Sequence, residues 1–346
     1  MRLMSSYGLV KIVVIGFGNV GRGLAKTIAL KNNELTKKLN ITVKVVGVVD
    51  SKGMALKKDG FTGIELLKLL EQPRSSVGSC EVYGRNYVDI EELYGEVQPD
   101  IHVELTPANY DTGEPGLSNI RRALNYGLNV VTANKSPLVK AFNELTALAQ
   151  VRNVKFKYTG TVMGATPFLR ALKWMKAHRV EYLRGILNST SNYILTLMHE
   201  KILSIEDAVK EAQLIGLAES NPSLDIDGLD AAAKLVIISN TLGHSIRFEN
   251  VERSSLRGID LRDIMIAIKN GYVYKQVSTL DLVKKRASVN VERIPVNDVL
   301  AGVKGAMNAV HIVTDTGEYF FQGKGGGGVE TAHTVLNDVL EIALGD

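Results

Sequence analysis

The stretch Gly16-Phe17-Gly18-Asn19-Val20-Gly21 decides the fold of the first half of the chain. It follows an apolar run at 11–15 that fits a buried strand, and it opens an amphipathic segment at 20–30 that fits a helix. In such a strand–turn–helix the first glycine allows a tight turn, Gly18 lets the backbone approach a pyrophosphate, and Gly21 lets the helix pack on the strand. The positive end of the helix faces the phosphates. The stretch therefore predicts a site for a nicotinamide dinucleotide.

Short apolar runs alternate with amphipathic stretches through this half of the chain. We expect strands at 11–15, 41–49, 101–105, 129–132 and 154–158, and helices at 20–30, 119–126 and 137–151. Such alternation predicts parallel βαβ units with right-handed crossovers, and hence an α/β domain with a Rossmann-type parallel sheet at 1–160. The polar segment at 31–40 is expected at the surface.

The pattern changes after about residue 159. Helices are expected at 190–200, 205–215 and 229–242, strands at 272–282, 287–294, 309–314 and 318–322, and a last helix at 331–344. Helices followed by strands favour a second, α+β domain at 161–322. Within it, Trp174 is expected to share a helix face with its apolar neighbours Leu169, Leu172 and Met175.

Composition excludes several classes of protein. The net charge of +4 is small for 346 residues, and Lys and Arg are interspersed with Asp and Glu, so we expect no nucleic-acid partner. The one cysteine, Cys80, allows neither an intramolecular disulfide nor a cysteine-based metal site. The apolar run at 9–15 is too short for a membrane span and is not expected to be part of a signal peptide. We therefore expect a cytoplasmic protein with no membrane partner.

Asp50 and Ser51 follow the second expected strand, 41–49. Asp50 lies 29 residues after Gly21, beyond the usual spacing of about 20 for the acid that binds the adenosine ribose. An aspartate there favours NAD, but three nearby lysines could neutralise the 2′-phosphate of NADP; they are Lys52, Lys57 and Lys58. The sequence therefore leaves NAD and NADP open.

The segment AESNPSLDIDGLDAAAK, residues 218–234, places four carboxylates within twelve residues and then a lysine. Asp230 and Lys234 are four residues apart, so on a helix they share one face. One interpretation is a capping loop with a surface ion pair. The other is a site for an amino-bearing substrate, where carboxylates hold an ammonium and a buried lysine moves a proton beside a carbonyl.

Several motifs, in this order, give the chain a family resemblance. They are GFGNVG at 16–21, LTP at 105–107, TANKSP at 132–137, TVMGATP at 161–167, NSTSNYIL at 188–195 and the acidic segment at 218–234. Together they resemble homoserine dehydrogenase over nearly the whole chain. The resemblance implies interconversion of L-homoserine and L-aspartate 4-semialdehyde, hydride transfer to or from NADP or NAD, a place in the pathway to threonine and methionine, and a homodimer formed through the second, substrate-binding domain.

The resemblance also implies roles for individual residues. Lys234 transfers the proton, Asp230 orients it and binds substrate, and Glu219 contacts the substrate amino group. Lys135 lies near the nicotinamide and acts in substrate binding and catalysis. The remaining substrate-site positions are Asp225, Asn188 and Thr190, and the remaining cofactor positions are Thr106, Pro107 and Gly327. The last of these implies that the segment 323–346 returns to the nucleotide domain.

Two positions depart from the family pattern. Thr159 stands where a glutamate is common, next to a site where relatives hold a monovalent cation through backbone carbonyls. The remaining matching positions, for Na⁺ or K⁺, are Val162, Gly164 and Thr166. The run Gly323–Gly328 replaces alternating Gly and Ala, which predicts a flexible backbone. Many relatives carry a C-terminal regulatory domain or a fused aspartate kinase, and we expect neither.

Alternatives to this function stay open on residue grounds. A related dehydrogenase of another amino or hydroxy acid fits the same plan, as does a dinucleotide-sensing protein without catalysis. A semialdehyde dehydrogenase that forms an acyl-enzyme needs a catalytic thiol. Cys80 lies in a variable-looking stretch and is expected to be incidental, and His102, inside an apolar strand, is expected to be structural.

Overall fold

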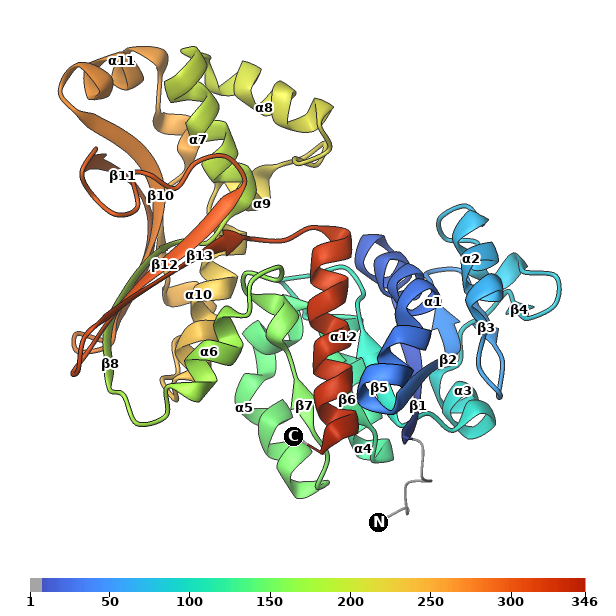
Figure 1. The fold of residues 1–346 in the computed structure, drawn as a ribbon. Helices are drawn as coiled ribbons and strands as arrows, with labels where there is room; N and C mark the ends of the chain where they lie inside the picture. Colours follow the sequence, from blue (N-terminus) through green and yellow to red (C-terminus); the bar gives the residue numbers. More distant parts are fainter. Residues whose placement is uncertain (1–7, 346) are drawn as a thin grey trace. The chain divides into compact units, whose positions relative to one another are not determined.

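The chain divides into two compact units (Figure 1). Unit 1 comprises residues 1–161 and 327–346, and unit 2 comprises residues 162–326. The structure, a computed structural model, describes residues 8–345. Residues 1–7, at the N-terminus where no signal peptide is expected, lie outside the described residues. The return to unit 1 begins at Gly327, four residues later than expected from the sequence, because the last strand of unit 2 continues to Lys324.

Unit 1 is built on a seven-stranded sheet. Its strands are β1 (Gly8–Ile15), β2 (Ile41–Val49), β3 (Met54–Leu56), β4 (Gly84–Arg85), β5 (Ile101–Glu104), β6 (Asn129–Thr132) and β7 (Phe156–Lys157). The order is β4-β3-β2-β1-β5-β6-β7. The five strands β2, β1, β5, β6 and β7 run parallel, which confirms the Rossmann-type sheet. The antiparallel edge strands β3 and β4 escaped prediction because runs of two or three residues carry no period.

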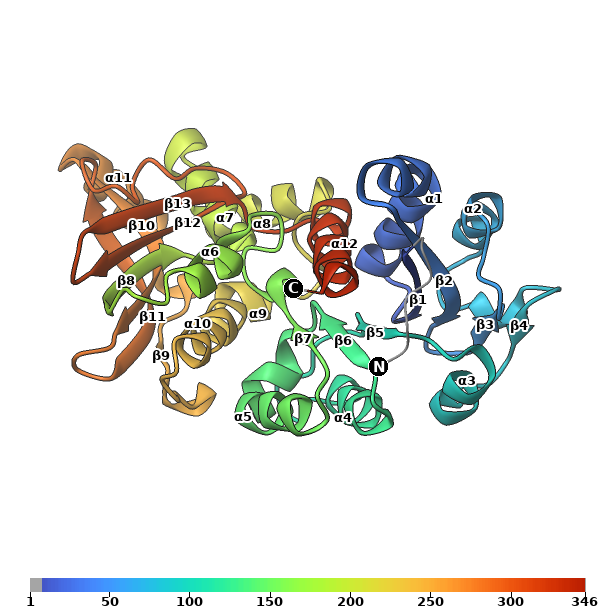
Figure 2. The ribbon, with the colours of Figure 1, turned by 60° about the horizontal axis from the view of Figure 1, so that its bottom comes forward.

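Helices cover both faces of this sheet (Figure 2). They are α1 (Asn19–Leu39), α2 (Gly63–Glu71), α3 (Ile90–Val97), α4 (Gly116–Tyr126), α5 (Lys135–Val151) and α12 (Gly328–Leu344). One core joins β1 and β2 to α1, α2 and α12, and the other joins them to α3, α4 and α5. Alternate strand residues, Val14 and Val13 for example, enter opposite cores, so both faces of the parallel sheet are buried.

Helix α1 is longer than its apolar pattern predicts. The polar segment 31–40, expected as a surface segment outside the helix, continues α1 to Leu39 and ends in the left-handed Asn40 (φ 57°). Leu35 and Leu39 pack against the core while no residue of the segment is fully buried, so its exposed face is polar. This extension accounts for the long spacing between Gly21 and Asp50.

Unit 2 is a six-stranded sheet with helices. Its strands are β8 (Val180–Ile186), β9 (Glu252–Arg253), β10 (Tyr272–Asp281), β11 (Arg286–Pro295), β12 (Met307–Thr314) and β13 (Glu318–Lys324), in the order β13-β12-β8-β10-β11-β9. Its helices are α6 (Phe168–Trp174), α7 (Ser189–Lys201), α8 (Ile205–Leu214), α9 (Ser223–Ile226), α10 (Leu229–Thr241) and α11 (Leu261–Lys269). The α+β expectation is confirmed, but the unpredicted β8 follows α6, precedes the other helices of unit 2 and lies inside the sheet.

One side-chain expectation for α6 is wrong. Leu169, Leu172 and Met175 are buried, but Trp174 is 84 % exposed and lies off their face. The helix period places residue 174 on the opposite side of this short helix. Among residues 8–345, no helix is both long and apolar enough to cross a membrane.

Candidate active site

The three glycines of the turn in unit 1 differ in what surrounds them. Gly16 has φ +101°, and a Cβ there would come 2.4 Å from the Leu105 carbonyl carbon. A Cβ on Gly21 would come 2.2 Å from the Gly16 oxygen. A Cβ on Gly18 would meet no protein atom within 4 Å. Gly16 and Gly21 are therefore needed by the fold, whereas the open space beside Gly18 is where a pyrophosphate would lie.

Gly18→Ala is therefore expected to spare the fold and weaken dinucleotide binding. An added methyl in a close backbone–ligand contact costs about 1–3 kcal/mol, or roughly 5- to 150-fold in Kd. The measurement is the Kd for NADH and NADPH alongside the melting temperature. Gly95→Ala is the matched control, since a Cβ on that α3 glycine also meets nothing within 4 Å. An unchanged Kd in Gly18→Ala would contradict this placement.

Asp50 directly follows β2, and its carboxylate accepts three backbone hydrogen bonds. Oδ1 accepts the N–H groups of Lys52 (2.9 Å) and Gly53 (3.1 Å), and Oδ2 accepts that of Val77 (2.8 Å). Ser51 Oγ donates to Ser75 Oγ at 3.0 Å. The acid predicted to bind ribose therefore also anchors the loop that follows α2.

Two of the three lysines proposed near the ribose do not lie there. Lys57 pairs with Glu65 (2.6 Å), and its backbone N–H donates to the Val46 carbonyl. Val46 is four residues before Asp50 on β2, roughly 13 Å away at strand spacing. Because β3 runs antiparallel to β2, Lys57 and Lys58 are carried away from the carboxyl end of the sheet. The placement of these two lysines was wrong, and Lys52 alone remains.

The loops after β5 and β6 are tied together. Asn134, the N-cap of α5, donates from Nδ2 to Thr106 Oγ1 (3.2 Å) and to the Pro107 carbonyl (3.4 Å). Lys135 is the first residue of α5 and is half-buried. Thr106, Pro107 and Lys135, predicted from separate motifs, therefore lie at the same edge of the sheet as the glycine turn.

Glu104 lies beneath these loops and was not predicted. It is fully buried, its Oε1 accepts the Thr106 N–H (2.8 Å) and hydroxyl, and its Oε2 accepts Asn119 Nδ2 (3.0 Å). His102, also fully buried, lies with Nε2 3.5 Å from Glu104 Oε2 and Nδ1 2.7 Å from the Tyr94 hydroxyl. Burial together with the adjacent Glu104 charge raises the pKa of Tyr94. No single-sequence pattern marks a carboxylate inside an apolar strand as part of such a network.

The C-terminal segment returns to the glycine turn. Gly327, at φ +133°, is the N-cap of α12. A Cβ on Gly23 of α1 would come 2.8 Å from the Gly328 oxygen, and one on Gly328 would come 3.0 Å from the Asn19 oxygen. Helices α1 and α12 therefore approach closely at their N-termini, and Gly327 lies beside the turn.

In unit 2, Asn188 joins two of the predicted carboxylates. Its Nδ2 donates to Asp225 Oδ1 (2.6 Å) and Asp230 Oδ2 (2.9 Å). Lys234 Nζ lies 2.7 Å from Asp230 Oδ2 and donates to the Leu187 carbonyl at 2.5 Å. Lys234 is only 8 % exposed, so the interpretation as a surface ion pair is wrong. We call Asn188, Asp225, Asp230 and Lys234 the Asn188 cluster.

The chain holds this cluster through helix termini. Asn188 is the N-cap of α7, where its Oδ1 accepts the Ser191 N–H at 2.8 Å. Gln276 of β10 donates to the Asp225 carbonyl (3.1 Å) and accepts from Ser191 Oγ (2.9 Å). Thr190 is buried and donates to the Leu217 carbonyl (3.3 Å). Burial, and then the charge of Asp230, raise the pKa of Asp225.

Two other carboxylates of the acidic segment lie outside the cluster. Asp227 accepts Ser255 Oγ (2.6 Å) and Arg257 Nε (3.2 Å), a structural role. Glu219 is exposed, and its side chain makes no hydrogen bond or ion pair with any described residue between 8 and 345. The resemblance implies that Glu219 contacts the substrate amino group, but no hydrogen bond or ion pair between described residues joins its side chain to the Asn188 cluster.

The segment at 162–166 shows features of a backbone cation site. Gly164 N–H donates to Gly325 O (2.9 Å) and Thr166 Oγ1 to Lys324 O (3.0 Å), which fixes the segment to the end of β13. Val162 and Gly164 are buried, and their carbonyls accept no hydrogen bond from the described residues. The Thr166 carbonyl accepts the Phe168 N–H. Thr159, in unit 1, is buried and donates its N–H to Asp338 Oδ2 (3.0 Å).

The glycine run Gly323–Gly328, which begins at the end of β13, is not simply a flexible segment. A Cβ at Gly323 would come 2.1 Å from Thr166 Oγ1, and one at Gly325 would come 1.3 Å from Asn308 Oδ1. Gly326 has open space, so only there is alanine sterically free. Close packing against β12 and the 162–166 segment is therefore what demands glycine.

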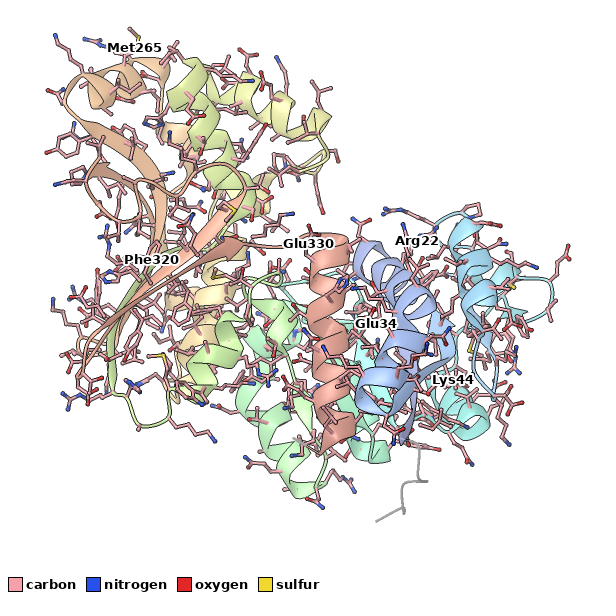
Figure 3. All side chains as sticks on the ribbon, in the orientation of Figure 1. Arg22, Glu34, Lys44, Met265, Phe320 and Glu330 are labelled. Atoms are coloured by element: carbon pink, nitrogen blue, oxygen red, sulfur yellow. The ribbon has the colours of Figure 1, made fainter. Side chains whose placement is uncertain are left out.

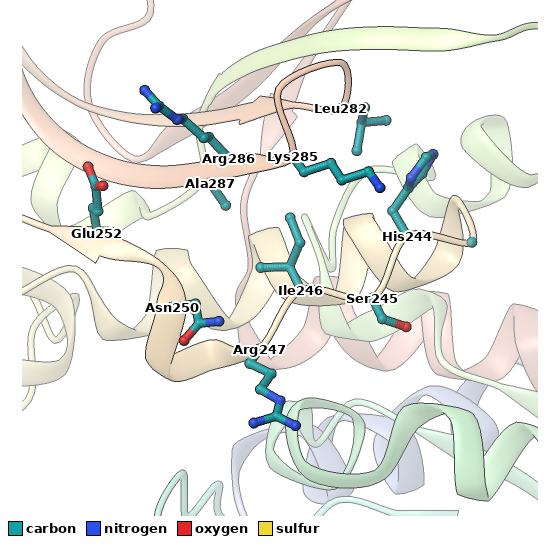
Figure 4. Close-up of a pocket in the computed structure, with 11 residues that line it drawn as sticks. His244, Ser245, Ile246, Arg247, Asn250, Glu252, Leu282, Lys285, Arg286 and Ala287 are labelled. Carbon is teal, nitrogen blue, oxygen red and sulfur yellow. The ribbon is translucent and has the colours of Figure 1, made fainter.

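A cavity of about 510 Å³ opens elsewhere on unit 2 (Figure 4). It lies between residues 243–252 and the hairpin at 282–287, and none of the predicted site residues lines it. Arg247 and Arg286 point to opposite sides of it, so its charges do not converge on one ligand (Figure 4). It is not the site that the motifs describe.

Comparisons with known proteins agree with both units. Residues 16–159 match the family profile "Homoserine dehydrogenase, NAD binding domain", and residues 167–340 match "Homoserine dehydrogenase". Homoserine dehydrogenase of Methanocaldococcus jannaschii is 36% identical over 339 residues, which cover 96% of this chain and 98% of the relative. The NAD(+)-dependent homoserine dehydrogenase of Pseudomonas canavaninivorans is 35% identical, with 96% of each chain covered.

Solved structures give the same result. A hyperthermophilic archaeal homoserine dehydrogenase in complex with NADPH matches with TM-score 0.82 and 29% identity over 98% of each chain. The homoserine dehydrogenase from Thiobacillus denitrificans matches with TM-score 0.81 and 29% identity, covering 97% of this chain and 73% of that one. The motifs, the two-unit fold and these relatives together show that this chain belongs to the homoserine dehydrogenase family and is an NAD(P)-dependent oxidoreductase.

Proposed function

We propose that the chain converts L-homoserine and NAD(P)⁺ to L-aspartate 4-semialdehyde, NAD(P)H and a proton, and catalyses the reverse reaction, with Lys234 moving the proton. The observation that carries this proposal is the position of Lys234, buried and bonded to Asp230 and to the Leu187 carbonyl. An ammonium has three N–H donors. These two partners leave one donor of Lys234 for a substrate oxygen.

The charge of the Asn188 cluster suits an amino-bearing substrate. Asp225 and Asp230 share one neutral amide, and Lys234 is the one cation paired with them, so the cluster carries one excess negative charge. Burial makes that charge costly unless a cation accompanies it. The substrate ammonium would supply this cation.

The other residues would act at the substrate oxygen and the cofactor. Bound at the glycine turn, NAD(P) supplies the hydride acceptor or donor. Asp230 would hold Lys234 in place, and Lys135, at the N-terminus of α5, would stabilise the negative charge that develops on the substrate oxygen. Thr106 and Pro107 would line the cofactor on the neighbouring loop.

The test is oxidation of L-homoserine by the purified chain with NAD and with NADP, against a panel of other amino and hydroxy alcohols. We expect L-homoserine to have the highest kcat/KM in the panel. A faster alternative substrate would overturn the assignment. Interconversion of L-aspartate 4-semialdehyde and L-homoserine would place the enzyme in the aspartate-derived pathway to threonine and methionine.

Asp225→Asn is expected to raise KM for homoserine about 10- to 100-fold, because a charge-assisted bond to the ammonium is lost. Since Asp225 binds only when ionised and its pKa is raised, KM in the unchanged enzyme should rise on acidification before an ordinary aspartate is protonated. The measurement is the pH profile of KM. Asp227→Asn is the control, because that residue bonds to Ser255 and Arg257 instead. Equal effects of both changes would argue against the role.

A monovalent cation would bind the carbonyls of Val162 and Gly164, with that of Thr166 as a third ligand. The carbonyls of these two buried residues accept no hydrogen bond from the described residues, which supports the site, because such groups seek a partner. Rates in matched Na⁺, K⁺ and tetramethylammonium buffers test it, and equal rates in all three would exclude it.

The chain would form a homodimer through the face of the unit 2 sheet opposite the Asn188 cluster. Strand register places Arg184, His311 and Phe320 on this face, and Phe320, labelled in Figure 3, is 43 % exposed. Gln276, which reaches Ser191 and Asp225, lies on the other face. Light scattering of Phe320→Asp against the unchanged chain tests whether this face holds two copies together.

A further inference from the structure

We propose that Arg74 and Ser75, on the loop after α2, bind the 2′-phosphate of NADP together with Ser51 and make NADP the preferred cofactor. The inference rests on the proposed function only in that the glycine turn binds NAD(P). It concerns a loop that neither the glycine motif nor the end of β2 identifies.

The loop reaches the two places that flank an adenosine ribose in a Rossmann fold. Arg74 Nη2 donates to Oδ1 of Asn19, in the glycine turn, at 2.6 Å. Ser75 Oγ accepts from Ser51 Oγ at 3.0 Å, beside Asp50 at the end of β2. The ribose 2′ position is read at the end of this strand, and an arginine nearby accommodates a 2′-phosphate.

Two sets of contacts hold the loop in this position. Val77 N–H donates to Asp50 Oδ2 at 2.8 Å. Arg22 of α1 donates to the carbonyls of Leu70 and, at 3.1 Å, of Gln72, so it fixes the end of α2; Figure 3 shows Arg22 between α1 and α2. Its guanidinium also lies 5.5 Å from the Phe17 ring of the turn. Arg22 is thus a positioning residue for the loop.

Asp50 is poorly placed to select NAD. Its carboxylate accepts three backbone N–H groups, which occupy both oxygens and offset its charge. An NAD-selective acid instead offers its oxygens to the ribose hydroxyls. A phosphate beside this compensated carboxylate meets less repulsion than the bare sequence suggests.

The cationic groups nearby have no acidic partner. Among residues 8–345, Arg74 bonds only to the neutral Asn19 amide, and Lys52 makes no side-chain bond. Arginine is suited to bidentate contact with phosphate. Ser75 Oγ, which accepts from Ser51, keeps its own proton to donate. The residue adopts a left-handed φ of 57°, a costly conformation for serine that directs this hydroxyl.

The test compares cofactors in the full chain. We expect kcat/KM for NADP to exceed that for NAD at least about tenfold, and Arg74→Ala to lower the NADP value about 10- to 100-fold with the NAD value within about twofold. Ser75→Gly accommodates the left-handed backbone and removes the hydroxymethyl group, so it should lose part of the same preference. Arg152→Ala is the matched control, since Arg152 likewise donates to a neutral amide, Asn125, at 2.9 Å on the surface of unit 1.

Kd values for NADPH and NADH, measured without substrate, separate this inference from the proposed function. If the chain oxidises no homoserine but Arg74→Ala lowers its affinity for NADPH, the proposed reaction is refuted and the role of the loop in binding the 2′-phosphate is supported. A preference for NAD, or equal losses for both cofactors in Arg74→Ala, would overturn the proposal, because stacking on adenine affects both cofactors alike.

Discussion

Lys234→Ala should lower kcat for homoserine oxidation about 10³-fold or more while leaving the Kd for NADPH unchanged, because general acid–base catalysis contributes about 10²–10⁴-fold and the lost charge adds to it. Lys234 is 8 % exposed and keeps one N–H donor for substrate. Its partners, Asp230 and Leu187, belong to unit 2, so dinucleotide binding by unit 1 does not depend on it. The measurements are single-turnover rate and cofactor affinity.

Removing Lys234 also leaves Asp230 buried without its cation, so loss of activity has to be separated from loss of fold. The melting temperature of Lys234→Ala reports the second. Added primary amines should restore part of the rate to Lys234→Ala, since a small amine can occupy the space left by the side chain. Lys201→Ala is the matched control, as Lys201 pairs with Glu211 at 2.7 Å on the surface of the same unit. Turnover near that of the unchanged enzyme would refute the role of Lys234.

Lys275→Met should remove a pH dependence of stability worth about 3.5 kcal/mol. Lys275 of β10 is 3 % exposed and donates to Asn192 Oδ1 (2.9 Å) and to the Val303 carbonyl, with no carboxylate within ion-pair distance among residues 8–345. Burial, with a smaller contribution from Lys304, lowers its pKa from 10.5 to about 8. At about 1.4 kcal/mol per unit, this shift gives the expected size.

The sign follows from proton linkage. Between pH 8 and 10.5 the unfolded chain holds a proton on Lys275 that the folded chain has lost, so the free energy of unfolding rises with pH across this window. Below pH 8 the full penalty is present. Denaturant unfolding at pH 7.5 and pH 10 should therefore show a rise in the unchanged chain that Lys275→Met lacks. Lys210→Met, which removes an exposed lysine paired with Asp207 at 3.2 Å, should keep the rise. The same rise in Lys275→Met would contradict the assignment.

Local patterns predicted elements well and connections poorly. Long strands and helices such as β2, α7 and α10 were placed within one or two residues, since their periods extend over many residues. The strands β3 and β4 were missed because two or three residues are too few to show a period. Helix α3 was missed although its buried residues, Ile90, Leu93, Tyr94 and Val97, follow the helical period. The polar end of α1 was missed as well, because only Leu35 and Leu39 continue its apolar face among mostly polar residues.

The sequence by itself determined the features that neighbouring residues make. Gly16, Gly18 and Gly21 define the dinucleotide turn within six residues, and Asp230 and Lys234 meet because one helical turn separates them. Only the tertiary structure decided what distant segments make. Asn188 joins carboxylates 37 and 42 residues away, and Arg74 reaches Asn19 across 55 residues. It also left the Glu219 side chain without a bond to the cluster among the described residues, and it carried Lys57 away from the carboxyl end of the sheet. The reason is physical: helix and strand periods fix the direction of a side chain along one element, whereas packing of elements fixes which directions converge.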